Sequence, residues 1–230
     1  MTMFMELKRI WEEHKFTSTI VEEFSSMLEY SEEMLSYALK VLTTKSKAKK
    51  FQKKIYFKDQ KINITEQEIR KRVLIRLTTS PGGNLPACLA LISIVKDAER
   101  LGDYIKNIFE LHTMFRDFKD GGKMFNLIFE DLGNEVIELL RKVNEAFKNS
   151  DSELALECTG QGRKIAKRCE NVLKELLDCN YSVTHTVVLT LGAQYFKRLA
   201  LHLSNIATSI FLPLPEMDYI NSKDSEKEEN

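Results

Sequence analysis

Two carboxylates four residues apart, Glu99 and Asp103, are the side chains with the clearest chemical potential in this 230-residue sequence. On an α-helix this spacing places both side chains on one face, with their Cβ atoms about 5–6 Å apart. Two exposed carboxylates so placed repel each other by about 0.2–0.5 kcal/mol, and a bound cation would reverse that repulsion. Mg, Ca, Mn, Fe and Zn ions all accept carboxylate oxygens as ligands. The pair therefore predicts either a metal site or a solvated acidic face.

A second polar stripe lies upstream, where Asp59, Asn63 and Glu66 recur at steps of four and three residues. If the helix that carries this stripe is an antiparallel neighbour of the helix that carries the acidic pair, the two stripes converge. The candidate metal ligands are then Glu99, Asp103, Asp59 and Asn63, with Glu66 and Arg100 in supporting positions. The alternative is a solvated acidic face whose charge is balanced by nearby cations, namely Lys96, Arg100 and Lys106.

Long helices must position these residues. The chain has only 9 Gly and 4 Pro, which favours uninterrupted helices, and no strand alternation stands out. Apolar side chains at three- and four-residue steps predict six helices, over residues 16–44, 49–78, 85–116, 123–148, 152–177 and 183–212. Polar and glycine-containing breakers separate them, at 79–84, 120–122, 149–151 and 178–182. The sequence predicts an all-α fold of six long antiparallel helices.

Two helical segments, residues 96–108 and 194–206, resemble each other. Arg, Leu, Asn and Ile recur at the same offset, whereas Lys197 and Leu201 stand where the first segment has its two carboxylates. A weaker echo relates Lys61-Ile62 to Lys164-Ile165. The repetition predicts two tandem three-helix bundles, residues 1–118 and 122–212, the second with a degenerate acidic motif. The acidic, polar residues 213–230 are predicted to be a disordered tail.

The segment 97–108, which reads DAERLGDYIKNI, resembles the signature of the PhoU family, found on the third helix of each repeat. Residues 59–63 resemble the family's second-helix motif, an acidic residue, three others and then Asp. The resemblance covers about residues 16–212 and is specific around 97–108. It implies a duplicated helical fold that binds multinuclear metal clusters, iron or zinc among them, through acidic motifs on the second and third helices.

The family's metal ligands carry over only in the N-terminal half. Glu99, Asp103 and Asp59 match the acidic motifs, whereas Asn63 replaces a carboxylate by a weaker, neutral oxygen ligand. The corresponding positions of the second half hold Gly162, Ala166, Lys197 and Leu201. The resemblance therefore implies at most one metal site, of a divalent ion or a multinuclear cluster. Leu201 on a formerly polar face indicates either a subunit interface or ordinary packing within the chain, and we expect a homo-oligomer, most simply a dimer.

The resemblance implies a cytoplasmic regulator of phosphate uptake and phosphate-starvation signalling. Such a protein acts by contact with a phosphate ABC transporter, a sensor histidine kinase or both, and we expect membrane contact only through these partners. Two alternatives stay open: a metal-free helical adaptor, and a metal-dependent hydrolase that uses Glu99, Asp103 and Asp59. The formal net charge of zero gives no bulk attraction to nucleic acid, and we expect no nucleic-acid partner.

Other motifs narrow the function further. The sequence has no GxSxG, no HExxH and no complete phosphate-binding loop, so we expect no enzymatic activity. Its four Cys lack CxxC spacing, which predicts buried, reduced thiols. The sequence has no run of 18 apolar residues, so we expect no membrane-spanning helix. A lysine-rich run over residues 45–61 indicates a solvated face or a dock for an acidic partner or anionic lipid head groups.

Overall fold

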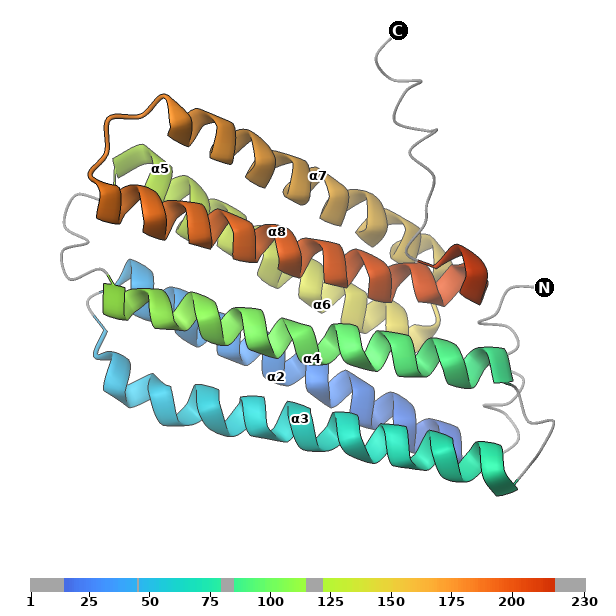
Figure 1. Ribbon diagram of the computed structural model, residues 1–230. Coiled ribbons are helices and arrows are strands. Elements are labelled where there is room, and N and C mark those ends of the chain that lie inside the picture. The colour runs from blue at the N-terminus through green and yellow to red at the C-terminus, as the bar shows by residue number, and fades with distance from the viewer. Residues whose placement is uncertain (1–14, 45, 80–84, 115–121, 218–230) are drawn as a thin grey trace, which may run out of the picture.

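The computed structural model describes residues 15–44, 46–79, 85–114 and 122–217, and within them the chain is helical with no strand. Figure 1 shows the long helices, which are α2 (Lys15–Thr43), α3 (Ala48–Thr79), α4 (Leu85–Met114), α6 (Gly133–Asn149), α7 (Ser152–Leu177) and α8 (Val183–Phe211). Two short elements, α5 (Gly122–Asn126) and the π-helix η2 (Leu127–Leu132), lead into α6, and the 3₁₀ turn η3 (Leu214–Glu216) follows α8. The all-α prediction is confirmed, and five of the six predicted helices agree with these bounds within two residues. The fourth, predicted over residues 123–148, corresponds to α5, η2 and α6 taken together.

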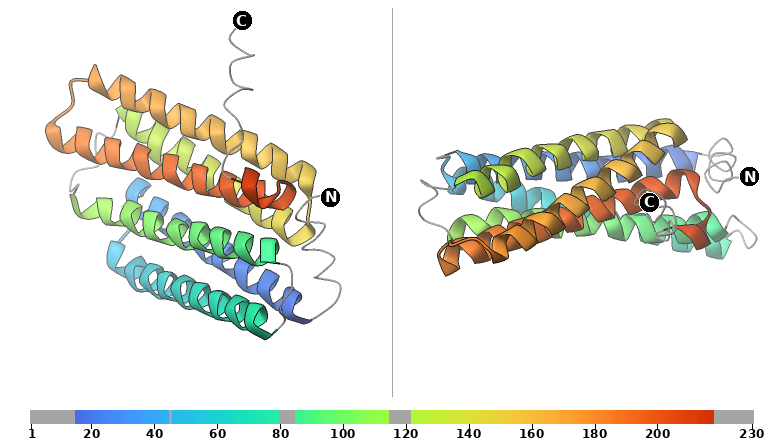
Figure 2. Two further views of the ribbon diagram at one scale, coloured as in Figure 1. Left: turned by 45° about the vertical axis from the view of Figure 1, so that its right-hand side comes forward. Right: turned by 90° about the horizontal axis from the view of Figure 1, so that it is seen from above.

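The helices form two layers of packed neighbours (Figure 2). Helices α2, α3 and α4 pack on one another, as do α6, α7 and α8, and the two sets meet where α2 packs on α6 and α4 on α8. Helices α3 and α7 lie at opposite outer edges of the assembly (Figure 1). The division into domains at 1–118 and 122–212 stays a prediction, because one core runs through both sets. The predicted breakers at 80–84 and 120–121 and the tail from 218 lie outside the described residues.

Aromatic and aliphatic side chains join the two sets of helices. The rings of Phe24 on α2 and Phe147 on α6 lie 4.4 Å apart, and the buried Ser25 hydroxyl donates a 2.6 Å hydrogen bond to Asn144 beside them. Full burial of each such apolar side chain stabilises the fold by about 1.5–3 kcal/mol. The apolar side chains of α3 that recur on one face are buried at Ile55, Ile62, Ile69 and Val73, whereas Leu77 is only half-buried.

The helix ends follow the predicted signals. Asp151 caps α7, since its side chain accepts from the backbone N–H groups of Glu153 and Leu154 at 3.1 and 3.0 Å. Ser150 ends α6 in the left-handed conformation, with φ of 58°. The predicted continuous fourth helix is interrupted by the π turn η2, which ends at Gly133. A Cβ at Gly133 would lie 2.9 Å from the Leu39 side chain, so the backbone approaches α2 closely there.

Two further sequence predictions concern the cysteines, expected to be buried thiols, and the absence of a membrane-spanning helix. The structure has free thiols, buried at Cys88, Cys158 and Cys169 but only half-buried at Cys179. Burial raises the pKa of Cys158 to about 11 and that of Cys169 to about 12, which keeps both protonated at neutral pH. Among the described residues, each helix is too short or too polar to cross a bilayer.

Gly162 allows α7 and α8 to pack with their backbones in contact. A Cβ at this position would lie 2.8 Å from the carbonyl oxygen of Ala200, and closer still to the Ser204 hydroxyl. Gly160, on the same helix, has nothing within 4 Å of its own Cβ position. The two glycines therefore separate the effect of close packing from the intrinsic helix preference of alanine.

Gly162→Ala should lower the free energy of unfolding by about 1–3 kcal/mol, because the added methyl group forces the two helix backbones apart. Gly160→Ala should raise it by about 0.5–1 kcal/mol, because alanine is the better helix former and meets no neighbour. Urea unfolding of both variants measures the difference. Equal stabilisation by the two substitutions would contradict the close contact at Gly162.

Candidate functional site

The polar stripe of α3 lies at the edge of the core. Asp59 and Glu66 are each 8% exposed and share a face with the buried Ile62 and Ile69, while Asn63 beside them is half-buried. A carboxylate that leaves water to this extent needs a positively charged or hydrogen-bonding partner. Each of the two carboxylates has a cationic partner across the interface on α4, and Glu66 has a second one, Arg70, on α3 itself.

Gly102 brings α4 against this stripe. A Cβ there would lie 3.2 Å from Cδ1 of Ile62 and 3.5 Å from Oδ1 of Asp59, so a larger side chain would have to push the helices apart. The close approach lets the side chains flanking Gly102 on α4 reach those of α3. The predicted convergence of the two acidic stripes is therefore seen in the structure.

Lys106 bridges the first pair of carboxylates. Its Nζ lies 3.0 Å from Oδ2 of Asp59 and 3.3 Å from Oδ1 of Asp103. Burial acts to lower the pKa of Lys106, but the hydrogen bonds and charges of Asp59 and Asp103 outweigh it, and the net effect is a raised pKa. The ammonium group thus stays charged between two carboxylates that would otherwise repel each other.

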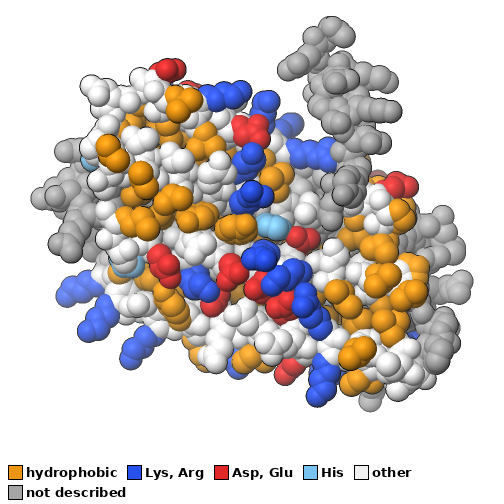
Figure 3. Space-filling model, in the orientation of Figure 1, with side chains coloured by type: hydrophobic (Ala, Val, Ile, Leu, Met, Phe, Trp, Pro, Cys, Tyr) orange, Lys and Arg blue, Asp and Glu red, His pale blue; other side chains and the backbone are white. Residues whose placement is uncertain are grey.

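Lys96 lies near the second pair as an ion-pair partner, although neither of the two oxygens it approaches accepts a hydrogen bond. Its Nζ lies 2.5 Å from Oε2 of Glu99 and 3.7 Å from Oε1 of Glu66. Arg70 adds a second cation to Glu66 at 3.1 Å, and Arg100 lies 3.8 Å from Asp103. We call these eight side chains the charge cluster: Asp59, Glu66, Arg70, Lys96, Glu99, Arg100, Asp103 and Lys106. Figure 3 shows the resulting band of interleaved acidic and basic side chains across the middle of the molecule.

The charge cluster brings the predicted ligands together but does not fit a resident metal ion as arranged. A metal ion needs its oxygen ligands at about 2.0–2.6 Å, whereas here a lysine ammonium lies between the carboxylates of each pair. The four carboxylates face four cations, so the cluster has no excess negative charge. Within the described part of the chain, no group of three or more His, Cys, Asp and Glu is placed to hold a metal. Metal binding by Asp59, Asn63, Glu99 and Asp103 stays a prediction.

The corresponding surface between α7 and α8 is built differently. Gly162 and Ala166 are buried against α8, and Lys197 forms a single ion pair with Glu170 at 2.7 Å. Leu201 is half-buried. Close packing and the Lys197–Glu170 ion pair thus join the two helices of the second half, whereas a network of charges joins α3 and α4 in the first half.

A contact between the halves was not predicted. Nδ1 of His202 on α8 lies 2.7 Å from Oδ1 of Asp97 on α4, and the ring of Tyr104 stacks on His202 with centroids 5.6 Å apart. Asp97 belongs to the acidic signature, but sequence spacing gave no signal that would pair it with a histidine 105 positions later. This contact fixes α4 against α8 beside the charge cluster.

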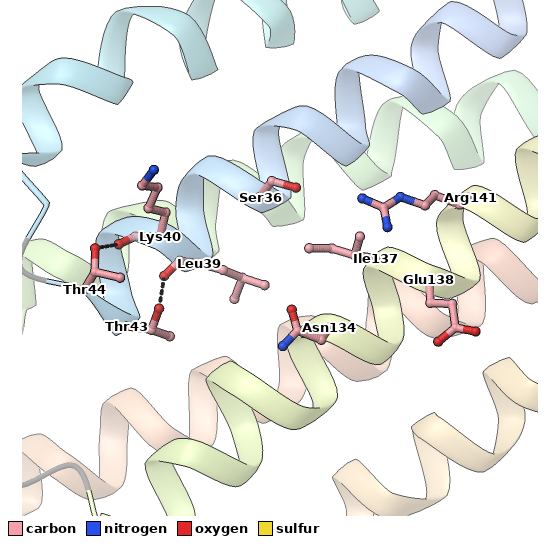
Figure 4. A pocket seen from close by; sticks show the side chains of 9 residues that line it. All are labelled: Ser36, Leu39, Lys40, Thr43, Thr44, Asn134, Ile137, Glu138 and Arg141. Carbon is pink, nitrogen blue, oxygen red and sulfur yellow. Dashed lines mark hydrogen bonds between the residues drawn. The ribbon is translucent and has the colours of Figure 1, made fainter.

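A groove between α2 and α6 is a second candidate site (Figure 4). Ser36, Lys40, Thr43, Thr44 and Arg141 supply its hydroxyl groups and cations. Thr43 and Thr44 donate to the carbonyl oxygens of Leu39 and Lys40, and Arg141 pairs with Glu32 at 2.6 Å. The groove holds no paired carboxylates, and its polar groups are largely engaged by the protein itself, so we assign it no chemistry.

The comparisons with known proteins concern the same helices. The family model described as the PhoU domain matches residues 24–111, from α2 to α4. The chain is 23% identical over 159 residues to the phosphate-specific transport system accessory protein PhoU of Serratia marcescens, and this match covers 66% of the chain and 65% of that protein. It is 28% identical over 210 residues to an uncharacterised protein of Methanocaldococcus jannaschii, across 85% of the chain and 68% of that protein.

Solved structures share the fold. The crystal structure of PhoU from Pseudomonas aeruginosa superposes with a TM-score of 0.75 at 17% identity, and covers 85% of this chain and 95% of that one. The phosphate transport system regulatory protein PhoU from Streptococcus pneumoniae gives a TM-score of 0.69 at 19% identity, with the same coverage. The described helices thus have the architecture of these proteins.

Removing the Lys106 ammonium should destabilise the protein. Lys106→Met leaves Asp59 buried beside Asp103 without its cation, and we expect a loss of about 1–3 kcal/mol in the free energy of unfolding. Lys142→Met is the matched control, because Lys142 bridges Glu138 and Glu157, whose side chains are 60% and 61% exposed, and should change stability by no more than about 0.5 kcal/mol. Urea unfolding at neutral pH compares the two variants.

The stabilisation that Lys106 provides should depend on pH in a defined direction. Since the folded pKa of Lys106 is raised above its ordinary value of 10.5, its contribution is fully present below 10.5 and disappears as the pH rises through the folded value. The stability gap between wild type and Lys106→Met should therefore be constant near neutrality and shrink in strong alkali. A gap no larger than that of the Lys142 control would contradict the bridging role.

Proposed function

We propose that the chain is a divergent member of the PhoU family and that it regulates phosphate uptake and phosphate-starvation signalling, which its resemblance to the PhoU domain and to PhoU proteins supports. In this proposal the protein acts in the cytoplasm by contact with a phosphate ABC transporter, a sensor histidine kinase or both. The family relation supports a role in phosphate-transport regulation in general. The partners are the finer part of the proposal, since the chain spans about two thirds of the length of the relatives it matches.

The observation that carries the proposal is the domain match over residues 24–111. It spans both acidic stripes, and in the structure these form the charge cluster. A regulator that works by binding partners needs a rigid surface of this kind and no reacting group. The hydrolase alternative would need an open metal position and a base, and the carboxylates of the cluster are instead held by lysine and arginine.

We propose that the charge cluster holds α3 on α4 without a bound metal ion. This favours a regulator that contains no metal. Lys96 and Lys106 supply the positive charge that a metal ion would otherwise bring between α3 and α4. The cluster then has a mechanical role, which is to hold α3 on α4 so that the outer face of α3 is presented to a partner. Dimer formation stays a prediction: Leu201, which prompted it, is half-buried on α8.

Deletion of the gene from the source organism tests the regulatory role. We expect phosphate uptake and phosphate-starvation reporters to become active in phosphate-rich medium, because the negative regulator is missing. Expression of the intact chain from a plasmid should restore repression. Unchanged uptake together with unchanged reporter activity in the deletion strain would overturn the proposal.

Elemental analysis of the purified protein tests the metal-free cluster. After purification without chelators and incubation with zinc or iron salts, we expect well under one metal ion per chain, because ammonium groups lie between the ligands. The paired variant Lys96→Met with Lys106→Met should gain divalent-metal binding, since four carboxylates would then face only two arginines. Stoichiometric metal in the wild-type protein that is lost in Glu99→Ala with Asp103→Ala would instead establish the predicted metal site.

A further inference from the structure

The outer face of α3 concentrates lysines around exposed apolar side chains. We call it the basic face, and it comprises Lys49, Lys50, Lys53, Lys54, Phe57, Lys61, Ile64, Lys71 and Ile75, all exposed. Phe57, Ile64 and Ile75 are 57%, 40% and 50% exposed. Their spacings of seven and eleven residues place them in one line along the helix, on the side opposite the buried Ile55, Ile62 and Ile69. Helix α3 therefore has a second ordered face that the described part of the chain leaves exposed.

The charge of this helix is strongly asymmetric. Between residues 48 and 79 there are ten Lys and Arg against three Asp and Glu, although the whole chain is neutral. Two of the three acids, Asp59 and Glu66, are buried toward α4. Within the described residues, none of the six lysines of the basic face has a carboxylate within ion-pair distance. The other outer helix, α7, has five cations against four acids and no such excess.

We propose that the basic face docks on an anionic lipid bilayer, with the lysines over the head groups and the line of apolar side chains at the interface. This inference goes beyond the proposed function and does not depend on it. It replaces the expectation that membrane contact occurs only through partners. Polybasic helices with a few apolar anchors are attracted to the negative surface of the cytoplasmic leaflet in this manner.

The shape and chemistry of the face favour a bilayer over an acidic protein. The face is the outer side of one helix at the edge of the molecule (Figure 1), and a bound peptide helix would need a groove. All six cations are lysines, which act as hydrated point charges, whereas site-specific recognition of carboxylates favours the planar fork of arginine. Arg70 and Arg72 of the same helix point elsewhere, to Glu66 and Glu23. A flat, diffuse anionic surface is the partner that fits these features.

Vesicle sedimentation tests the proposal with the full chain. Purified protein is mixed with vesicles of phosphatidylcholine alone or with about one third phosphatidylglycerol. We expect binding only to the anionic vesicles at low salt, and release in about 1 M salt, where the screening length falls to about 3 Å. Absence of binding to anionic vesicles at low salt would overturn the proposal and leave an acidic protein as the partner of this face.

Matched charge reversals locate the surface. Lys53→Glu with Lys54→Glu and Lys61→Glu should abolish binding, since each lysine near the surface contributes about fivefold to the partition. Lys164→Glu with Lys167→Glu and Lys174→Glu reverses three exposed lysines of α7. This control variant should bind anionic vesicles within about twofold of the wild-type protein. Phe57→Ala with Ile75→Ala should weaken binding at constant charge. Circular dichroism confirms that each variant is folded, and equal losses from the α3 and α7 reversals would contradict docking through the basic face.

Discussion

The packing of α3 on α4 depends on neutralising carboxylates that are almost removed from water. Asp59 and Glu66 are each 8% exposed, and an unpaired charge at that depth would cost several kcal/mol. Lys106 and Lys96 supply the missing charge from α4, and Gly102 permits the approach that brings the ammonium groups within reach. Together with the packing of α3 on α2, this interface sets the position of α3 and the direction in which its basic face points.

The two halves of the protein hold their corresponding helix pairs, α3 with α4 and α7 with α8, together by different interactions. In the second half a buried glycine and a buried alanine on α7 let the helix backbones meet, and Lys197 pairs with Glu170 at the margin. In the first half carboxylates occupy the interface and lysines balance them. An apolar helix interface can pack tightly without balancing any charges. An interface that contains carboxylates is stable only when each of them has its cationic or hydrogen-bonding partner. The segment that resembles the PhoU signature, residues 97–108, lies on α4 within this charge network.

Most of the fold could be predicted from the sequence because apolar spacing determines which faces of long helices are buried. The predicted helix bounds, the break at residues 149–151 and the convergence of Asp59 with Asp103 all depend on local spacing and on one antiparallel contact. The bridging lysines were foreseen only as a balancing charge, because a lysine three residues from a carboxylate can equally extend into water. The contact of His202 with Asp97 joins two residues that are 105 positions apart in the sequence, and no local sequence pattern predicts it. The π turn before Gly133 likewise left no spacing signal.

The most direct measurement of the central claim is a double-mutant cycle between Lys106 and Asp59, which lie 3.0 Å apart. It compares the unfolding free energies of wild type, Lys106→Met, Asp59→Asn and the double variant. If the ammonium group neutralises the buried carboxylate, the double variant should be less destabilised than the sum of the single variants, with a coupling of about 1–3 kcal/mol. Additivity within about 0.5 kcal/mol would mean that the two groups act independently, and the account of how α3 is held on α4 would be wrong.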